Sequence, residues 1–150
     1  YEIEVRFKPG DATQYGLILY KNPDGSEFTK LYIDTEKGKL VFDKEKTSVA
    51  NSTAVTTARM MPQAPNQRPA QSRWIDEDVY VVSNPGEVVL HIFIDGSVVD
   101  GFIDNEDAFT NRIYPSKENS TMVEIFSNGT DTKASADMWK ISEAKVQMNY

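Results

Sequence analysis

Apolar and polar residues alternate with a period of two in many parts of the chain. In the opening run YEIEVRF, every odd position is apolar or aromatic and every even position is charged. This alternation is typical of a β-strand with one buried face and one solvated face. Turn sequences such as NPDG and EKG separate these runs about every 8–12 residues, which favours an all-β sandwich or barrel. Strands are predicted at 1–7, 15–20, 28–34, 39–43, 79–82, 87–94, 97–103, 108–114, 121–127 and 136–141.

The last predicted strand lies within 132–145, a stretch that also suits a short helix. We favour a closing strand there, with Trp139 packed on the sandwich.

The clearest strand and turn pattern covers residues 90–115. Asp95-Gly96 predicts a two-residue hairpin turn, because Gly adopts positive φ freely and Asp tolerates it. A polar run at 104–107 ends the following strand. The stretch therefore predicts an antiparallel meander, with polar side chains such as Asp100 and Arg112 among the apolar ones.

Residues 47–78 interrupt the rhythm of strands and turns. They are rich in Ser, Thr, Ala, Asn, Gln and Pro, and prolines at 62, 65 and 69 exclude regular structure in the later part. A segment of this length without secondary structure is usually either functional or mobile. Trp74, near its end, is therefore a candidate for a functional role.

Length and charge limit the classes of function. A chain of 150 residues is about one domain, and its net charge of −7 argues against a nucleic-acid partner or an anionic membrane surface. No apolar run approaches the roughly 20 residues of a membrane helix. Because the chain begins at Tyr1 without Met or a signal peptide, it is expected to be a processed product or a fragment of a longer protein.

Residue types argue against most catalytic chemistry. The chain has no Cys and a single His, His91, which is expected to be a partly exposed sheet residue. This excludes thiolate catalysis and makes a hydrolytic triad or a transition-metal site improbable, so no cofactor or metal is expected. The acidic run at 104–107 lacks calcium-loop spacing, and 23 acidic residues make any carboxylate pair uninformative.

Carbohydrate binding has different requirements, and the chain carries suitable residue types. Asp95 and Asp100 could accept hydrogen bonds from sugar hydroxyls, and Arg112 could donate through its fixed fork. Tyr114 and Trp74 could offer apolar faces to a sugar ring. The same residues also allow an alternative in which Asp100 and Arg112 form a salt bridge within the sheet and the aromatic residues belong to the core.

Two sequence runs resemble the C-terminal β-sandwich domain of glycoside hydrolase family 32, which contains invertases, levanases and inulinases. These runs are HIFIDGSVVDGFI at 91–103 and TNRIYP at 110–115. The segments FKPGDA at 7–12 and YIDTEKGKLVFDK at 32–44 also resemble that domain. Two positions depart from the family pattern: Gly96 replaces an Arg, and Asp100 replaces a Glu.

The resemblance implies a two-sheet antiparallel β-sandwich of the jelly-roll or concanavalin-like type. It also implies that residues 1–150 are one module, the C-terminal part of a longer hydrolase that is extracellular or periplasmic. The family's catalytic residues lie in a separate propeller, and this chain contains none of its Asn-Asp-Pro-Asn, Arg-Asp-Pro or Glu-Cys motifs.

Three functions remain open from the sequence. The first is a non-catalytic module that binds fructans or fructose-containing oligosaccharides through Asp95, Asp100, Arg112, Tyr114 and Trp74. The second is a purely structural domain that supports its own catalytic β-propeller. The third, an independent glycanase, lacks a recognisable carboxylate pair.

Overall fold

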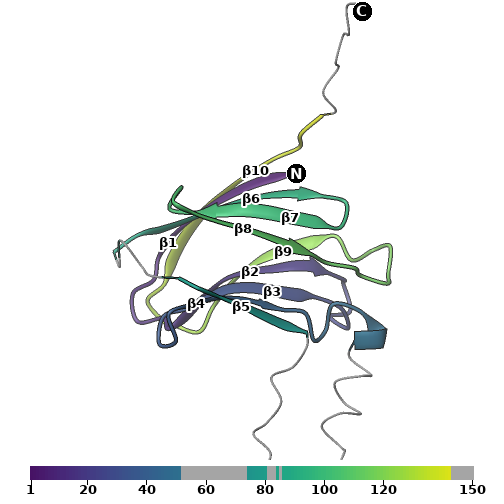
Figure 1. Ribbon diagram of the computed structural model, residues 1–150, viewed down its shortest axis with the longest axis horizontal. Coiled ribbons are helices and arrows are strands. Elements are labelled where there is room, and N and C mark those ends of the chain that lie inside the picture. The colour runs from purple at the N-terminus through teal and green to yellow at the C-terminus, as the bar shows by residue number, and fades with distance from the viewer. Residues whose placement is uncertain (52–73, 81–83, 85, 143–150) are drawn as a thin grey trace, which may run out of the picture.

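The computed structural model describes residues 1–51, 74–80, 84 and 86–142, and within them two antiparallel sheets pack face to face (Figure 1). Sheet A has the strand order β10-β1-β6-β7-β8, and sheet B has the order β5-β4-β3-β2-β9. The strands are β1 (Glu2–Lys8), β2 (Gln14–Lys21), β3 (Thr29–Asp34), β4 (Lys39–Asp43), β5 (Ile75–Val79), β6 (Val88–Asp95), β7 (Val98–Ile103), β8 (Asp107–Arg112), β9 (Met122–Ser127) and β10 (Lys133–Trp139). The predicted two-sheet β-sandwich is confirmed.

The core lies between the inner faces of the two sheets. Alternation in β1 and β6 places one apolar side chain of every two on the inner face of sheet A. Aromatic pairs join the sheets, since the rings of Phe7 and Tyr15 are 5.3 Å apart and those of Phe42 and Phe109 are 5.6 Å apart. Each large apolar side chain buried in this way stabilises the fold by about 1.5–3 kcal/mol.

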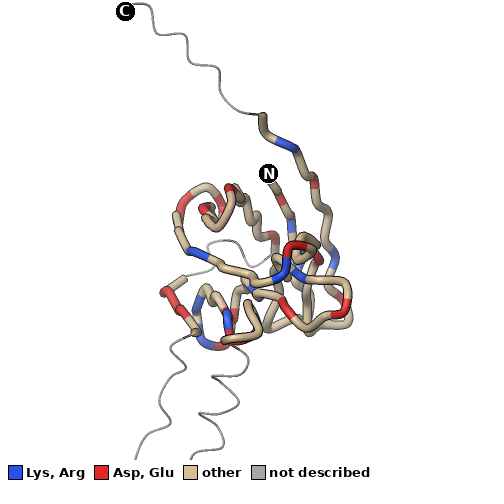
Figure 2. The backbone as a smooth tube through the Cα atoms, turned by 90° about the vertical axis from the view of Figure 1, so that its right-hand side faces the viewer, with Lys and Arg blue, Asp and Glu red and all other residues tan. Residues whose placement is uncertain are grey.

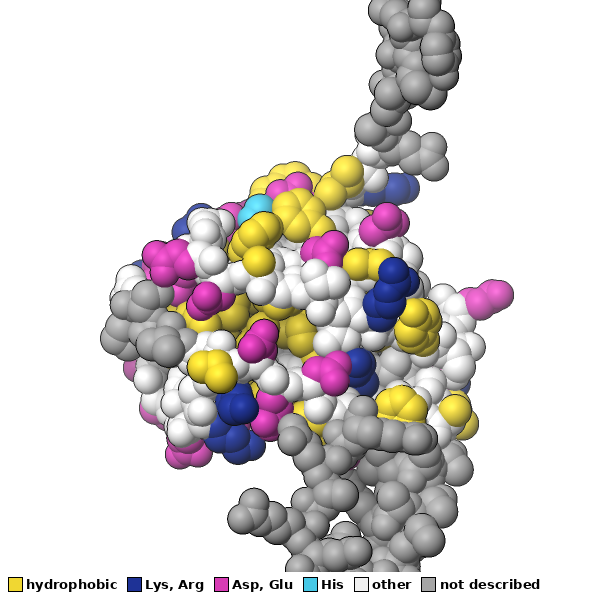
Figure 3. Space-filling model, viewed as in Figure 1, with side chains coloured by type: hydrophobic (Ala, Val, Ile, Leu, Met, Phe, Trp, Pro, Cys, Tyr) yellow, Lys and Arg dark blue, Asp and Glu magenta, His cyan; other side chains and the backbone are white. Residues whose placement is uncertain are grey.

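The edge strand β5 of sheet B lies opposite the edge strand β8 of sheet A, and together they form one edge of the sandwich. Figure 3 shows apolar side chains in the hollow between the sheets on this face. Asp76 of β5 accepts a hydrogen bond from Asn111 Nδ2 of β8 at 2.9 Å, which links the sheets across this edge. β9 and β10 occupy the opposite ends of the two strand orders.

Two strands begin three or more residues before the predicted position. The strand expected at 79–82 is β5 at Ile75–Val79, so the irregular segment predicted for 47–78 ends earlier than expected. The closing strand is β10 at Lys133–Trp139 rather than 136–141, and Trp139 is 47% exposed rather than packed into the sandwich. The prolines at 62, 65 and 69 lie outside the described residues.

The β6–β7 hairpin forms as predicted but with its turn one residue later. Asp95 pairs with Val98, so the two-residue loop is Gly96-Ser97. Gly96 has a φ of 54°, a left-handed conformation that Gly adopts without a Cβ penalty. His91 in β6 is partly exposed, as expected, and its Nε2 lies 2.8 Å from Glu2 Oε1.

No helix among the described residues is long and apolar enough to span a membrane.

Candidate functional site

A pocket of about 300 Å³ opens at one end of the edge between β5 and β8. Its described walls come from the segment after β4, from the residue before β5, and from the end of β8 with the residues that follow it. The volume is at the lower end of the range of roughly 300–1,000 Å³ that small-molecule sites occupy. The lining residues are Lys44, Thr47, Ser48, Asn51, Trp74, Asn111, Arg112 and Tyr114.

Lys44 is the half-buried centre of one wall, with 18% of its side chain exposed. Its Nζ donates to Asn111 Oδ1 at 2.9 Å and forms an ion pair with Asp76. Burial raises the pKa of the Asp76 carboxyl, but hydrogen bonds from Lys44 and Asn111 lower it further, so the net pKa lies below its ordinary value. The three side chains therefore hold two sheets together beside the pocket.

The segment 47–51 forms the next part of the wall and begins a helical turn. Ser48 has the role of an N-cap, because its Oγ accepts a hydrogen bond from the backbone N–H of Asn51 at 3.1 Å. Asn51 Nδ2 then donates to the backbone oxygen of Lys44 at 3.0 Å, which ties the turn to the end of β4. The side-chain oxygens of Thr47 and Thr29 are hydrogen-bonded inside the sandwich.

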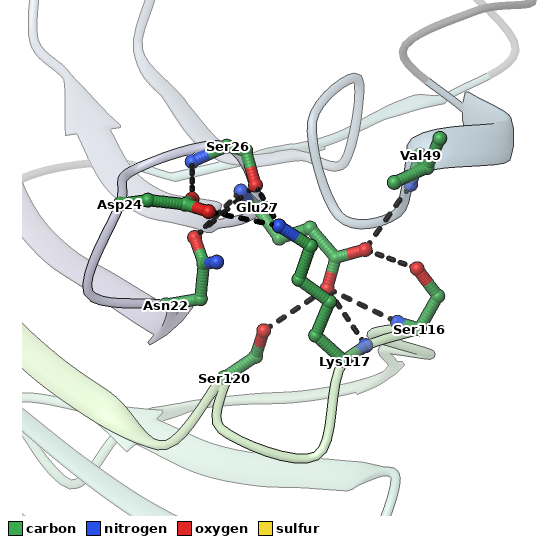
Figure 4. Close-up of polar contacts among 8 residues, drawn as sticks. All are labelled: Asn22, Asp24, Ser26, Glu27, Val49, Ser116, Lys117 and Ser120. Atoms are coloured by element: carbon green, nitrogen blue, oxygen red, sulfur yellow. Dashed lines mark hydrogen bonds and ion pairs between the residues drawn. The ribbon is translucent and has the colours of Figure 1, made fainter.

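Behind this wall lies Glu27, a carboxylate that is fully buried in the loop between β2 and β3 (Figure 4). Backbone N–H groups donate to it from Val49 at 3.2 Å, from Ser116 at 3.2 Å and from Lys117 at 3.0 Å. The hydroxyls of Ser116 and Ser120 donate as well. Glu27 thus connects the segment 47–51 with the segment 114–120, both of which contribute residues to the pocket.

Burial raises the pKa of the Glu27 carboxyl by penalising its charged form. Hydrogen bonds from Ser116, Ser120, Lys117 and Val49 act in the opposite direction, and the net pKa lies below the ordinary value of 4.5. The carboxylate is therefore ionised at neutral pH and acts as an acceptor-only anchor for the donors around it.

The structure brings three of the five sequence-predicted residues together. Trp74, Arg112 and Tyr114 line the pocket, and Tyr114 is 61% exposed. Asp95 ends β6 and Asp100 lies in β7; both are exposed and neither lines the pocket. Their register places them on the outer face of sheet A, with Asp95 in the same cross-strand row as Arg112 and Asp100 in the next row.

The alternative of a salt bridge within the sheet is not observed. Within the described ranges, neither Asp95 nor Asp100 lies within the 4.0 Å ion-pair limit of the Arg112 guanidinium. Tyr114 and Trp74 are not core residues either, since neither is buried. The guanidinium and the two rings are thus accessible to a ligand.

Sequence reasoning missed Lys44, Ser48, Asn51 and Asn111. One local signal was available, because a Ser three residues before an Asn suits the first turn of a helix. No signal could have paired Lys44 with Asn111, since they are 67 residues apart and meet only when the two sheets pack.

The pocket suits recognition of a small polar ligand. Arg112 offers five N–H donors in a fixed plane, and two aromatic side chains offer apolar faces. Among the described residues, no group of three or more His, Cys, Asp or Glu side chains could hold a metal ion.

Comparison with known proteins gave a family match over most of the chain. A family model described as "Glycosyl hydrolases family 32 C terminal" matches residues 1–140. No curated protein sequence matched the chain.

Several solved structures share the fold. An exo-inulinase from Aspergillus awamori has 18% identity and a TM-score of 0.63 over 90% of this chain and 24% of its own. A fructan 1-exohydrolase IIa from Cichorium intybus has 17% identity and a TM-score of 0.58 over 90% of this chain and 29% of its own. A sucrose-6-phosphate hydrolase from Lactobacillus gasseri has 20% identity and a TM-score of 0.55 over 90% of this chain and 23% of its own. The chain thus spans about a quarter of the length of these proteins.

Proposed function

The chain belongs to the family 32 glycosyl hydrolase C-terminal domains, and from this premise we propose that it is an accessory module that binds β-fructosides at the pocket beside β5 and β8. The C-terminal domain is the non-catalytic part of family 32 enzymes. The module would hold a fructan or a fructose-containing oligosaccharide near a catalytic propeller of the same protein. The proposed place of action is extracellular or periplasmic, where polymeric fructans are accessible to an enzyme.

One observation carries the proposal. Trp74 lies far in sequence from Arg112 and Tyr114, and the three residues line a single pocket. An exposed guanidinium beside two aromatic faces is a combination suited to the hydroxyls and the apolar C–H surface of a sugar.

Asp95 and Asp100 keep a proposed role outside the pocket. They lie on the outer face of sheet A in the two strands next to β8, and β8 ends at Arg112. An oligosaccharide that extends from the pocket over this face would meet their carboxylates, which can accept hydrogen bonds from two hydroxyls each.

Isothermal titration calorimetry with fructose, sucrose, inulin and levan tests the proposal. Binding is expected with roughly micromolar to millimolar Kd, because sugar hydroxyls exchange bonds to water for bonds to protein at small net gain. Arg112→Ala and Tyr114→Ala should weaken it at least about tenfold, a loss of about 1.4 kcal/mol. Arg6→Ala, which removes an exposed guanidinium from β1, away from β5 and β8, is the matched control. Absence of heat with all four sugars would overturn the proposal.

A second role, as a support for the catalytic propeller, is favoured by exposed apolar side chains on the outer face of sheet A. Phe102 is 40% exposed and Trp139 is 47% exposed, and the rings of His91 and Phe93 lie 4.8 Å apart on the same face. Figure 3 shows apolar side chains over this part of the molecule. Exposed apolar surface of this kind often marks a protein interface.

Mixing the chain with a family 32 propeller prepared without its own C-terminal domain tests this second role. Association is expected. The double substitution Phe102→Lys with Trp139→Lys should weaken this association without unfolding the domain, because both side chains are exposed. Sugar binding without association would leave the first role alone.

A further inference from the structure

Charged residues are segregated on the outer face of the β1–β10 ribbon. Acidic and basic positions are scattered over most of the backbone (Figure 2). On this face, however, β1 carries Glu2 and Glu4 towards one end and Arg6 and Lys8 towards the other. In β10, Lys133 is the residue opposite Lys8.

The cross-strand register creates local repulsion at this basic end. Lys8 and Lys133 are directly opposite each other in an antiparallel pair, and like charges in that position are destabilising. Lys8 Nζ lies 4.0 Å from Glu87 Oε2, at the limit of an ion pair, and Arg6 pairs with Glu4 at 2.5 Å. Within the described residues, the Lys133 ammonium has no carboxylate within ion-pair distance.

A pocket of about 310 Å³ lies over these residues. Its donors are the guanidinium of Arg6, two ammonium groups and the hydroxyl of Ser135, which is opposite Arg6 in the register. One carboxylate, that of Glu87, also lines it. The ionised oxygens of an oxyanion accept hydrogen bonds and carry negative charge, so they match a set of charged donors better than a neutral hydroxyl does.

We propose that this pocket binds a ligand that carries a phosphate, sulfate or carboxylate group. Lys8 and Lys133 hold the oxyanion between them, and Arg6 with Ser135 donates from one side. The pocket lies on the ribbon of β1 and β10, whereas the proposed fructoside site lies at the end of β5 and β8, on the opposite edge of the sandwich. The two sites are independent, and either can be occupied without the other.

Amide-resolved NMR titration of the whole chain with inorganic phosphate, and separately with galacturonate, tests the proposal at constant ionic strength. Saturable shifts are expected at amides of β1 and β10. Saturation by phosphate alone identifies a phosphate or sulfate ligand, and saturation by galacturonate alone identifies a carboxylate ligand. Saturation by both supports recognition of any oxyanion. No saturable shift with either probe would overturn the proposal.

Two variants assign the binding to the lysine pair. Lys133→Glu places an opposite charge beside Lys8, so it should abolish binding while the fold is retained. Lys8→Gln with Lys133→Gln should weaken binding at least about tenfold and raise the thermal midpoint in the absence of the anion, because the repulsion is removed. Lys140→Gln, which changes an exposed lysine beyond β10, is the control and should leave both the anion affinity and the thermal midpoint unchanged. Equal binding by all three variants would contradict the assignment.

Discussion

At the scale of single residues, Glu27 is important because its one carboxylate holds several segments of the chain together. A buried carboxylate is costly unless it is paired or fully hydrogen-bonded, and Glu27 meets this condition with five donors. Those donors are 22 to 93 residues away in sequence. No local sequence pattern could have predicted that this carboxylate is buried, because Glu27 is simply another polar residue in the turn after Asn22.

We expect Glu27→Gln to lower the free energy of unfolding by about 1–3 kcal/mol at neutral pH. The amide cannot accept from all five donors, and its NH₂ group would face other donors. Urea unfolding followed by circular dichroism measures the change. Glu118→Gln, at an exposed position nearby, is the matched control and should shift stability by less than about 0.5 kcal/mol. Equal stability of both variants would contradict the anchoring role.

The pKa of Glu27 also predicts a pH dependence. Burial raises the pKa of Glu27, but hydrogen bonds lower it further, to a net value below 4.5. The pKa of the buried Asp34 also lies below its ordinary value of 3.8, because hydrogen bonds from Gln14 and Lys37 outweigh the effect of burial. Because the unfolded chain binds protons more readily than the folded one, stability is fully present above about pH 4.5 and is lost as the pH falls through the folded pKa values. Urea unfolding at a series of pH values should show this loss, with a shallower slope for Glu27→Gln. A free energy of unfolding that does not change with pH in this range would contradict the prediction.

At the scale of elements, alternation located the strands whose two faces differ. β4 has the predicted limits, and β1 and β2 differ from theirs by one residue at each end or less. β5, with the sequence IDEDV, is an edge strand that is mostly exposed, so it has no buried face to leave a pattern. β10 is exposed along its whole length, and its limits were misplaced for the same reason.

The pairing of β2 with β3 makes Gly16 a sensitive position. A Cβ added at Gly16 would lie 2.1 Å from the backbone oxygen of Leu31 and 2.6 Å from the Cα of Tyr32. We therefore expect Gly16→Ala to cost about 3 kcal/mol, the upper end of the usual range for overpacking. Thermal or urea unfolding measures this cost.

Gly86→Ala is the matched control for that substitution. Its added Cβ would meet only Asn84 Oδ1, at the ordinary contact distance of 3.4 Å. A change within about 0.5 kcal/mol is expected there. A similar small change in stability at Gly16 would mean that β2 and β3 can move apart without a cost in the free energy of unfolding.

At the scale of the whole molecule, the site could be predicted only in part. The residue types of Arg112, Tyr114 and Trp74 were identifiable, and the structure places them around one pocket. Asp95 and Asp100 lie on the same outer face of sheet A as Arg112, but Asp95 is two strands away and Asp100 is one row further along β7, so neither lines the pocket. Lys44 and Asn111 required the packing of both sheets, which sequence spacing does not reveal.

The two tryptophans permit a test of whether residues 1–150 behave as one cooperative unit. Trp74 precedes β5 at the edge of sheet B, and Trp139 ends β10 at the opposite edge of sheet A. With a shared core, Trp74→Phe and Trp139→Phe should each leave a single fluorescence transition that coincides with circular dichroism. Separate fluorescence and circular dichroism midpoints in either variant would show that an edge unfolds independently.

The pocket lined by both Asn51 and Trp74 has a consequence for how the domain can diversify. These residues flank positions 52–73, so the two ends of that segment are fixed at one pocket. Closing a chain between fixed ends costs only about 0.6 kcal/mol more for each doubling of its length. The sandwich can therefore accept replacements of different length and composition at this point, and each replacement would begin and end beside the same pocket.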